Sequence, residues 1–121
     1  MITIRLPWPP KELSPNARVH WAKKAKAANG YRWYCRAETG TKWWAARSRY
    51  ASAPVNLAIT FHPPDRRRRD LDNMLASIKA GIDGIADALG VDDQHFSLRL
   101  ERGEPTKGGE VVAVITEGNE A

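Results

Sequence analysis

Residues 55–90 decide the fold, and they read VNLAITFHPPDRRRRDLDNMLASIKAGIDGIADALG. The first eight place an apolar side chain at every second position, which predicts a half-buried β-strand. A pair of prolines then ends the strand. From Leu71 to Leu89 an apolar residue recurs every three or four positions, which predicts an amphipathic helix that ends at Gly90.

Two glycines interrupt the side-chain pattern inside this helix. Gly81 and Gly84 each weaken an isolated helix by about 0.5–1 kcal/mol relative to alanine. They also leave room for a second backbone to come close, so we expect tight packing at these positions, either on the sheet or on a partner.

The flanking sequence adds three more strands. Alternating apolar residues predict a strand at 2–6, which ends at the prolines that follow, and a second at 96–101. Residues 111–115 predict a short fourth strand before a tail that frays from Glu117, and 11–19 are expected to form a loop.

Residues 20–50 are rich in Ala, Lys, Arg and Trp, which is typical of a helical region. Gly30 and Gly40 are expected to divide it into two or three helices. Eight of the ten aromatic residues lie in the first fifty positions, among Lys and Arg. Most of them are expected to pack on the sheet, and one or two could instead stack on bases or sugars of a nucleic acid.

The resulting order predicts an α/β (α+β) fold: one small domain, 1–121, in which helices pack a mixed four-stranded sheet in the order β-α-β-α-β-β. With 42% hydrophobic and 27% charged residues in a chain of 121, disorder and membrane insertion are excluded as classes. The start does not resemble a signal peptide, and one cysteine, Cys35, allows no internal disulfide. A reducing cytoplasm is the expected location.

Charge is divided unevenly along the chain. Residues 1–53 hold eleven Lys/Arg and two Asp/Glu, a net charge of +9, whereas residues 54–121 hold eight and twelve, a net charge of −4. A basic half suits a polyanion, and an acidic half offers carboxylates for a metal ion.

Acidic residues cluster at both ends of the predicted helix 71–89. Asp70 and Asp72 stand at its start, where helix capping is the ordinary role, and Asp92 and Asp93 follow its end. We expect the two carboxylates to project to the same side from an extended entry segment, with Asp70 before the helix and Asp72 near its N-cap. Four arginines, 66–69, directly precede them, and such a pairing suits a phosphodiester whose scissile phosphate is held by a hard cation.

Lys79 lies on the helix flank that carries Asp72 and Asp83, where it could contact a phosphate. His20, His62 and His95 lack metal-ligand spacing, and we expect them to be structural or to contact DNA.

Taken together, these segments resemble the RusA-type Holliday junction resolvases of bacteria and their phages, over nearly the whole chain. The resemblance rests on Leu6–Pro10, Ser14–Asn16, Asp65–Asn73, the Asp92-Asp93 pair and Thr106–Gly109. It implies a homodimeric, Mg²⁺-dependent endonuclease that cuts four-way DNA junctions, with no organic cofactor and no membrane partner.

The resemblance also implies site residues. The metal ligands would be Asp70, Asp72 and Asp93, with Asp92 as the alternative to Asp93. The family's lysine, four residues after the second aspartate, is replaced here by Ala76. Because the stretch that follows is about three residues longer than usual, the catalytic lysine is assigned to Lys79. The residues expected to contact DNA are Asn16, Arg66, Arg67, Arg68, Arg69, Asn73, Lys79 and Lys107.

Three other functions stay open on the sequence alone. The chain could bind junction DNA without cutting it, or cut flaps, other branched DNA or structured RNA. It could also be an adaptor whose arginines bind an acidic partner, although that function leaves the carboxylates unexplained.

Overall fold

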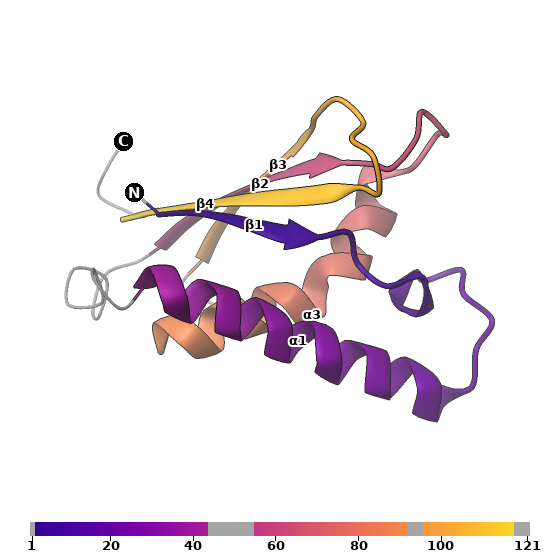
Figure 1. The fold of residues 1–121 in the computed structure, drawn as a ribbon, viewed down its shortest axis with the longest axis horizontal. Helices are drawn as coiled ribbons and strands as arrows, with labels where there is room; N and C mark the ends of the chain where they lie inside the picture. The colour runs from indigo at the N-terminus through magenta and orange to yellow at the C-terminus, as the bar shows by residue number, and fades with distance from the viewer. Residues whose placement is uncertain (1, 44–54, 92–95, 118–121) are drawn as a thin grey trace.

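The computed structural model describes residues 2–43, 55–91 and 96–117 (Figure 1). The elements are β1 (Ile2–Pro7), the 3₁₀ turn η1 (Lys11–Leu13), α1 (Trp21–Trp43), β2 (Val55–His62), α3 (Leu71–Leu89), β3 (Phe96–Arg102) and β4 (Glu110–Glu117). The predicted fold class and element order are confirmed. The turn η1 lies within the predicted loop, and β4 is longer than expected at both ends.

The four strands form one mixed sheet in the order β1-β4-β2-β3. β4 runs antiparallel to both of its neighbours, whereas β2 and β3 are parallel. α3 is therefore the crossover of a β2–α3–β3 unit and runs antiparallel to those strands. It begins at the sheet end where β2 finishes and ends where β3 begins, and both helices cover the same sheet face (Figure 1).

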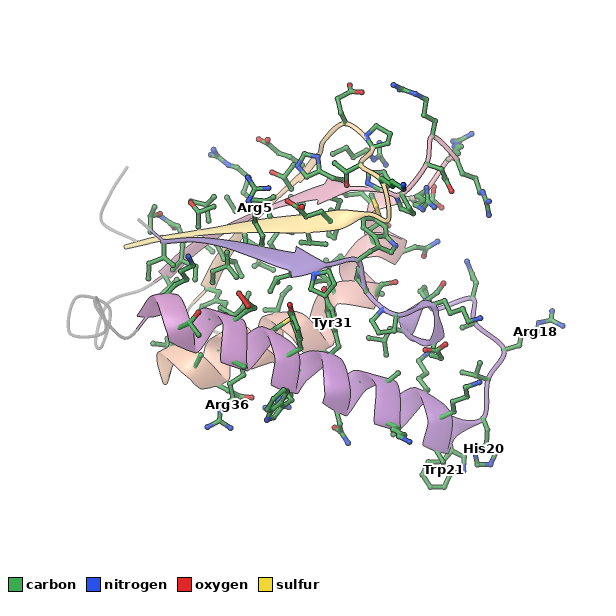
Figure 2. All side chains as sticks on the ribbon, viewed as in Figure 1. Arg5, Arg18, His20, Trp21, Tyr31 and Arg36 are labelled. Carbon is green, nitrogen blue, oxygen red and sulfur yellow. The ribbon has the colours of Figure 1, made fainter. Side chains whose placement is uncertain are left out.

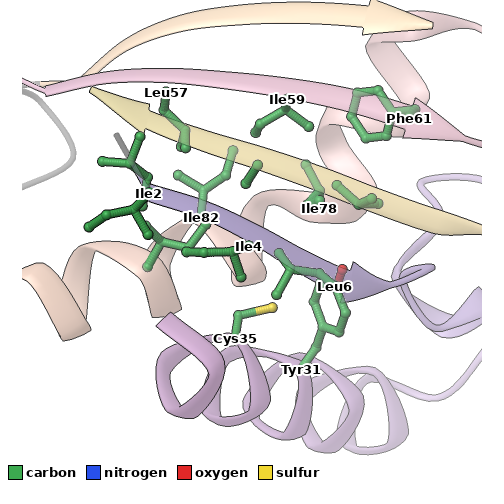
Figure 3. Packing of buried hydrophobic residues seen from close by; sticks show 14 of the residues in the cluster. Ile2, Ile4, Leu6, Tyr31, Cys35, Leu57, Ile59, Phe61, Ile78 and Ile82 are labelled. Atoms are coloured by element: carbon green, nitrogen blue, oxygen red, sulfur yellow. The ribbon is translucent and has the colours of Figure 1, made fainter. Parts of the chain in front are cut away.

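The hydrophobic core lies between this face and the two helices (Figure 3). The alternating residues of β2 are at most 1% exposed, which confirms the predicted strand. On α3 the apolar stripe is buried from Ile78 onward, but Leu71 and Leu75 are only partly buried and Met74 enters the core instead. Gly90 ends the helix in the left-handed conformation, with φ of 69°.

α1 is one uninterrupted helix of 23 residues, so the predicted division at Gly30 and Gly40 is wrong. The buried residues Tyr31, Cys35 and Thr39 recur every four positions and form a single contact stripe. Packing of this stripe on α3 and β1 outweighs the modest helix penalty of the two glycines. The end of the predicted helical region, 44–50, lies outside the described residues.

The two helices meet at Gly81 and Gly84, which confirms the predicted close packing at these positions. A Cβ built on Gly81 would come within 2.7 Å of the Tyr31 ring, and one on Gly84 would overlap the backbone carbonyl of Arg32. Tyr31 also donates a hydrogen bond to the Pro7 carbonyl, at 2.8 Å. Burial raises the pKa of Cys35 to about 12, so its thiol stays protonated and serves the packing.

α1 is long but strongly polar, and neither described helix has the length and apolar character needed to cross a bilayer.

Candidate metal and nucleic-acid site

The candidate site lies at the sheet end where β2 finishes, around the loop 63–70. Thr106 of the β3–β4 connection donates its backbone N–H to the Pro63 carbonyl at 2.9 Å, and Arg102 Nη2 reaches the Arg69 carbonyl at 3.3 Å. These contacts join the arginine loop to the connection that carries Lys107, which is exposed. Two segments that the sequence analysis expected to contact DNA are therefore neighbours.

Arg69 has a structural role within this loop. Its Nη1 donates to Asp65 Oδ1 at 2.8 Å and to the Arg67 carbonyl at 3.0 Å, and its guanidinium lies 5.7 Å from the Trp8 ring centroid. The hydrogen bond from Arg69, with a second from the Arg67 backbone N–H, lowers the pKa of Asp65. Asp65 therefore stays ionised and closes the loop, so Arg69 is less available to a ligand than its three neighbours.

Arg66, Arg67 and Arg68 are exposed to solvent. Arg66 lies 3.5 Å from Glu104 and Arg67 lies 3.8 Å from Asp65, but these exposed ion pairs are weak and exchange readily for another anion. Three exposed cationic side chains are therefore available to phosphate groups.

Asp70 occupies the N-cap position of α3 without using its side chain as a cap. Its backbone carbonyl accepts the first helical hydrogen bond, from Met74 at 3.1 Å. The carboxylate is exposed and makes no hydrogen bond or ion pair with any described residue. An N-cap aspartate that does not cap its helix is available to a ligand.

A cleft of about 580 Å³ opens beside this carboxylate. We call it the Asp70 cleft, and it is lined by Trp8, Pro9, Ser14, Asn16, Phe61, Arg68, Arg69, Asp70, Asn73, Met74 and Ser77. Five residues assigned from the sequence therefore meet here, from three segments of the chain. Amide, hydroxyl, guanidinium and carboxylate groups at one opening can bind a phosphodiester backbone through its oxygens.

Asp72 lines a different opening, which corrects the expectation that both aspartates project from an extended segment. The helix starts at Leu71, so Asp72 is already in its first turn, and residues two apart on a helix point about 200° apart. This opening, the Asp72 groove, has a volume of about 380 Å³ and is lined by Asp72, Leu75, Ala76, Lys79, Ile82, Phe96 and Leu98. Lys79 lies on the same side of the helix as Asp72, as its spacing predicted, and Ala76 lines the same groove.

Asp92, Asp93 and His95 lie outside the described residues. The described neighbours, Val91 and Phe96, lie at the end of α3 and the start of β3, which is the sheet end opposite Asp70. At 1.5 Å per residue, the 19 residues of α3 separate these ends by about 28 Å. Within the described ranges no three His, Cys, Asp or Glu side chains are grouped so that they could hold a metal ion.

The two described histidines have structural contacts, as expected. His20 Nδ1 accepts the backbone N–H of Ala22 at 3.1 Å at the start of α1, and His62 Nδ1 lies 2.8 Å from the Glu104 carbonyl.

The expectation that most of the early aromatic residues pack on the sheet is wrong for those that the structure describes, because three of the four on α1 whose side chains are described are exposed. Tyr31 is in the core, whereas Trp21 and Trp33 on α1 are 76% and 69% exposed. Figure 2 shows Trp21 at the N-terminal end of α1 and Arg36 directed away from the sheet. Trp8 was considered only as one of the eight early aromatic residues and as part of a motif, and it lines the Asp70 cleft beneath Arg69. Its position beside two prolines gave no separate sign of that contact.

No family model matches this sequence. It is 45% identical over 117 residues to an uncharacterized protein of Xylella fastidiosa, covering 96% of this chain and 76% of that protein. It is also 46% identical over 70 residues to the crossover junction endodeoxyribonucleases RusA of Escherichia coli K12 and of Enterobacteria phage 82. That segment covers 55% of this chain and 56% of RusA, so the match spans about half the length of these curated relatives. The chain therefore belongs to one family with the Xylella fastidiosa protein and is, over half its length, a homologue of the RusA endonucleases.

Proposed function

We propose that this protein is a homodimeric, Mg²⁺-dependent endonuclease that resolves four-way DNA junctions. The observation that carries the proposal is the start of α3, where two carboxylates without partners among the described residues stand beside three exposed arginines. The 70-residue similarity to the RusA endonucleases supports the same activity.

The chemistry of the two carboxylates suits a hard cation, although they line separate openings on either side of the first turn of α3. Asp70 and Asp72 offer only oxygen acceptors, and Mg²⁺ prefers oxygen ligands and keeps several of its waters. Asp93, or Asp92 in its place, would complete the set. Once bound, the ion would polarise a phosphoryl oxygen and lower the pKa of a bound water.

The chain's own residues bind and orient the substrate. Arg66, Arg67 and Arg68 neutralise phosphates next to the scissile bond, and Asn16 and Asn73 donate hydrogen bonds at the Asp70 cleft. Lys79 in the Asp72 groove stabilises negative charge that develops at the scissile phosphate. Without these cations, a pair of carboxylates would repel the DNA.

We place the complete site between two chains. α3 separates Asp70 and Asp72 from Val91 by about 28 Å, and this distance is the difficulty for a site whose third ligand follows Val91 in the same chain. A twofold dimer removes this difficulty, since each site would combine Asp70 and Asp72 of one chain with Asp93 of the other.

Mixed dimers test this arrangement. The variants D72N and D93N should each be inactive, and a mixture allowed to exchange subunits should regain nicking activity. Random pairing makes half of the dimers mixed, each with one intact site, so about a quarter of the wild-type sites return. A mixture that stays inactive, although exchange is verified, would place all three ligands within one chain.

The primary test of the proposed function uses a synthetic mobile junction with Mg²⁺ and then with EDTA. We expect paired symmetric cuts in Mg²⁺ and none in EDTA, resolved on a denaturing gel. Binding without cutting in either condition would indicate a non-catalytic junction-binding protein. Parallel duplex, flap and RNA substrates would reveal a nuclease with another preference.

Replacing Arg66, Arg67 and Arg68 together with Ala should weaken junction binding and flatten its salt dependence. Each lost phosphate contact lowers the slope of log affinity against log salt concentration by about 0.9. Arg69 is kept because it holds the loop together. R5A is the matched control, since Arg5 is an exposed arginine elsewhere on the sheet, paired with Glu110. An unchanged slope in the triple variant would remove this loop from the DNA contacts.

A further inference from the structure

β3 is an edge strand with an uncovered apolar side. Among the described strands it pairs with β2 alone, so no described strand pairs with the backbone groups of its other edge. Leu98 points to the helix side of the sheet, next to Leu57, yet it is 46% exposed whereas Leu57 is fully buried. An edge strand of seven residues with an exposed leucine can pair with a strand of another chain.

The opposite edge of the sheet is protected. β1 ends in Pro7, which cannot donate to a ladder, and its inward residues Ile2, Ile4 and Leu6 are at most 7% exposed beneath α1. The β1 edge therefore carries features that prevent strand pairing, whereas the β3 edge does not.

The Asp72 groove adjoins the β3 edge. Its lining is mostly apolar, with Leu75 and Ile82 from α3 facing Phe96 and Leu98 from β3. The helix–sheet core continues into this groove, but no described element closes it. A second body that added a strand beside β3 would pack against the apolar wall of this groove, which Phe96 and Leu98 form.

The opposite face of β3 carries a self-complementary charge pattern. Arg99 and Glu101 lie two residues apart on the outer face, both exposed and without an ion pair among the described residues. If a second copy paired antiparallel to β3 with the twofold axis at Leu100, residue 99 of each chain would stand opposite residue 101 of the other. This register forms two cross-strand ion pairs at once.

We propose that a second copy of this chain docks on β3 by antiparallel strand pairing centred on Leu100, joining two four-stranded sheets into one. The inference deepens the dimer of the proposed function, and it rests on the edge strand rather than on catalysis. Because the two strands run antiparallel, the start of β3 in the partner lies beside the end of β3 in the first chain. The partner's Phe96 then lies just beyond Arg102, at the sheet end where α3 of the first chain begins. That is the end at which the proposed site needs the second chain.

Charge reversal tests the register through the mass of the DNA-free protein in sedimentation equilibrium. Wild type should be a dimer, whereas R99E and E101R should each raise the dimer dissociation constant at least tenfold, because like charges would then face each other. The double variant R99E/E101R restores opposite charges and should recover the dimer. Circular dichroism of each variant checks that the fold is intact.

A cysteine cross-link locates the axis independently. Leu100→Cys should give a disulfide-linked dimer under mild oxidation, while Leu98→Cys should not, since in this register its copies lie about 13 Å apart. Wild type is the control, because Cys35 is buried. A monomeric wild type, a dimer indifferent to both reversals, or cross-linking at 98 instead of 100 would overturn the proposal. A dimer that meets these tests but cuts no junction would instead overturn the proposed function.

Discussion

The Asp72→Asn substitution should reduce cleavage of a four-way junction by at least about 1,000-fold while leaving junction affinity unchanged or slightly tighter. Losing a carboxylate ligand removes several kcal/mol of charge stabilisation from the transition state. Affinity is preserved because the exposed arginines remain and one negative charge near the DNA is lost. Cleavage is measured on denaturing gels, and affinity by gel shift in Ca²⁺ or EDTA.

Asp83→Asn is the matched control for this variant. Asp83 lies eleven residues along the same helix, within about 20° of Asp72 around the axis, and it loses the same charge. It is outside the proposed site, so its cleavage rate should stay close to that of wild type. If D72N still cut junctions at a comparable rate, Asp72 would not be a metal ligand. If D83N lost as much activity as D72N, the effect would come from the helix and not from a specific carboxylate.

The periodic spacing of apolar residues was enough to predict the strands and α3. β2 and α3 each bury one regular face, so periods of two and of three to four appear directly in the sequence. The continuity of α1 was not predictable, because what keeps Gly30 and Gly40 helical is packing against a distant segment. Strand order also depends on long-range pairing, which leaves no local pattern.

The candidate site was predictable as a set of residues but not as a geometry. Asn16, Arg68, Asp70 and Asn73 do line one cleft. Asp72 lines another opening because it lies in the first regular turn of α3, where its side chain points away from that of Asp70 instead of to the same side. Arg69 has a separate role because it contacts Asp65 and Trp8. The sequence shows four consecutive arginines, and no spacing rule indicates which of them makes these contacts. The Asp92-Asp93 prediction lies outside the described residues and stays a prediction.

The Gly84→Ala substitution should have the largest effect on stability of any single added methyl group in the two described helices. In an open helix interior, Gly→Ala stabilises by about 0.5–1 kcal/mol. At Gly84 the new Cβ would overlap the Arg32 carbonyl and lie 3.0 Å from the Arg36 backbone nitrogen. Backbone atoms cannot rotate away, so α1 must move off α3, and overpacking of this kind costs about 1–3 kcal/mol. The free energy of unfolding is measured by urea titration.

Gly30→Ala on the neighbouring helix α1 should stabilise the protein, in contrast to Gly84→Ala on α3. A Cβ at Gly30 meets nothing within 4 Å, and the residue is helical, so this variant should gain about 0.5–1 kcal/mol. The two substitutions add the same atom to the same residue type in neighbouring helices, so only the space around each can make their effects differ in sign. Stabilisation by G84A as well as by G30A would mean that α1 and α3 are further apart than this fold requires. The buried stripe of Tyr31, Cys35 and Thr39 would then have no close surface on α3 to pack against. Packing could then no longer explain why α1 continues through Gly30 and Gly40.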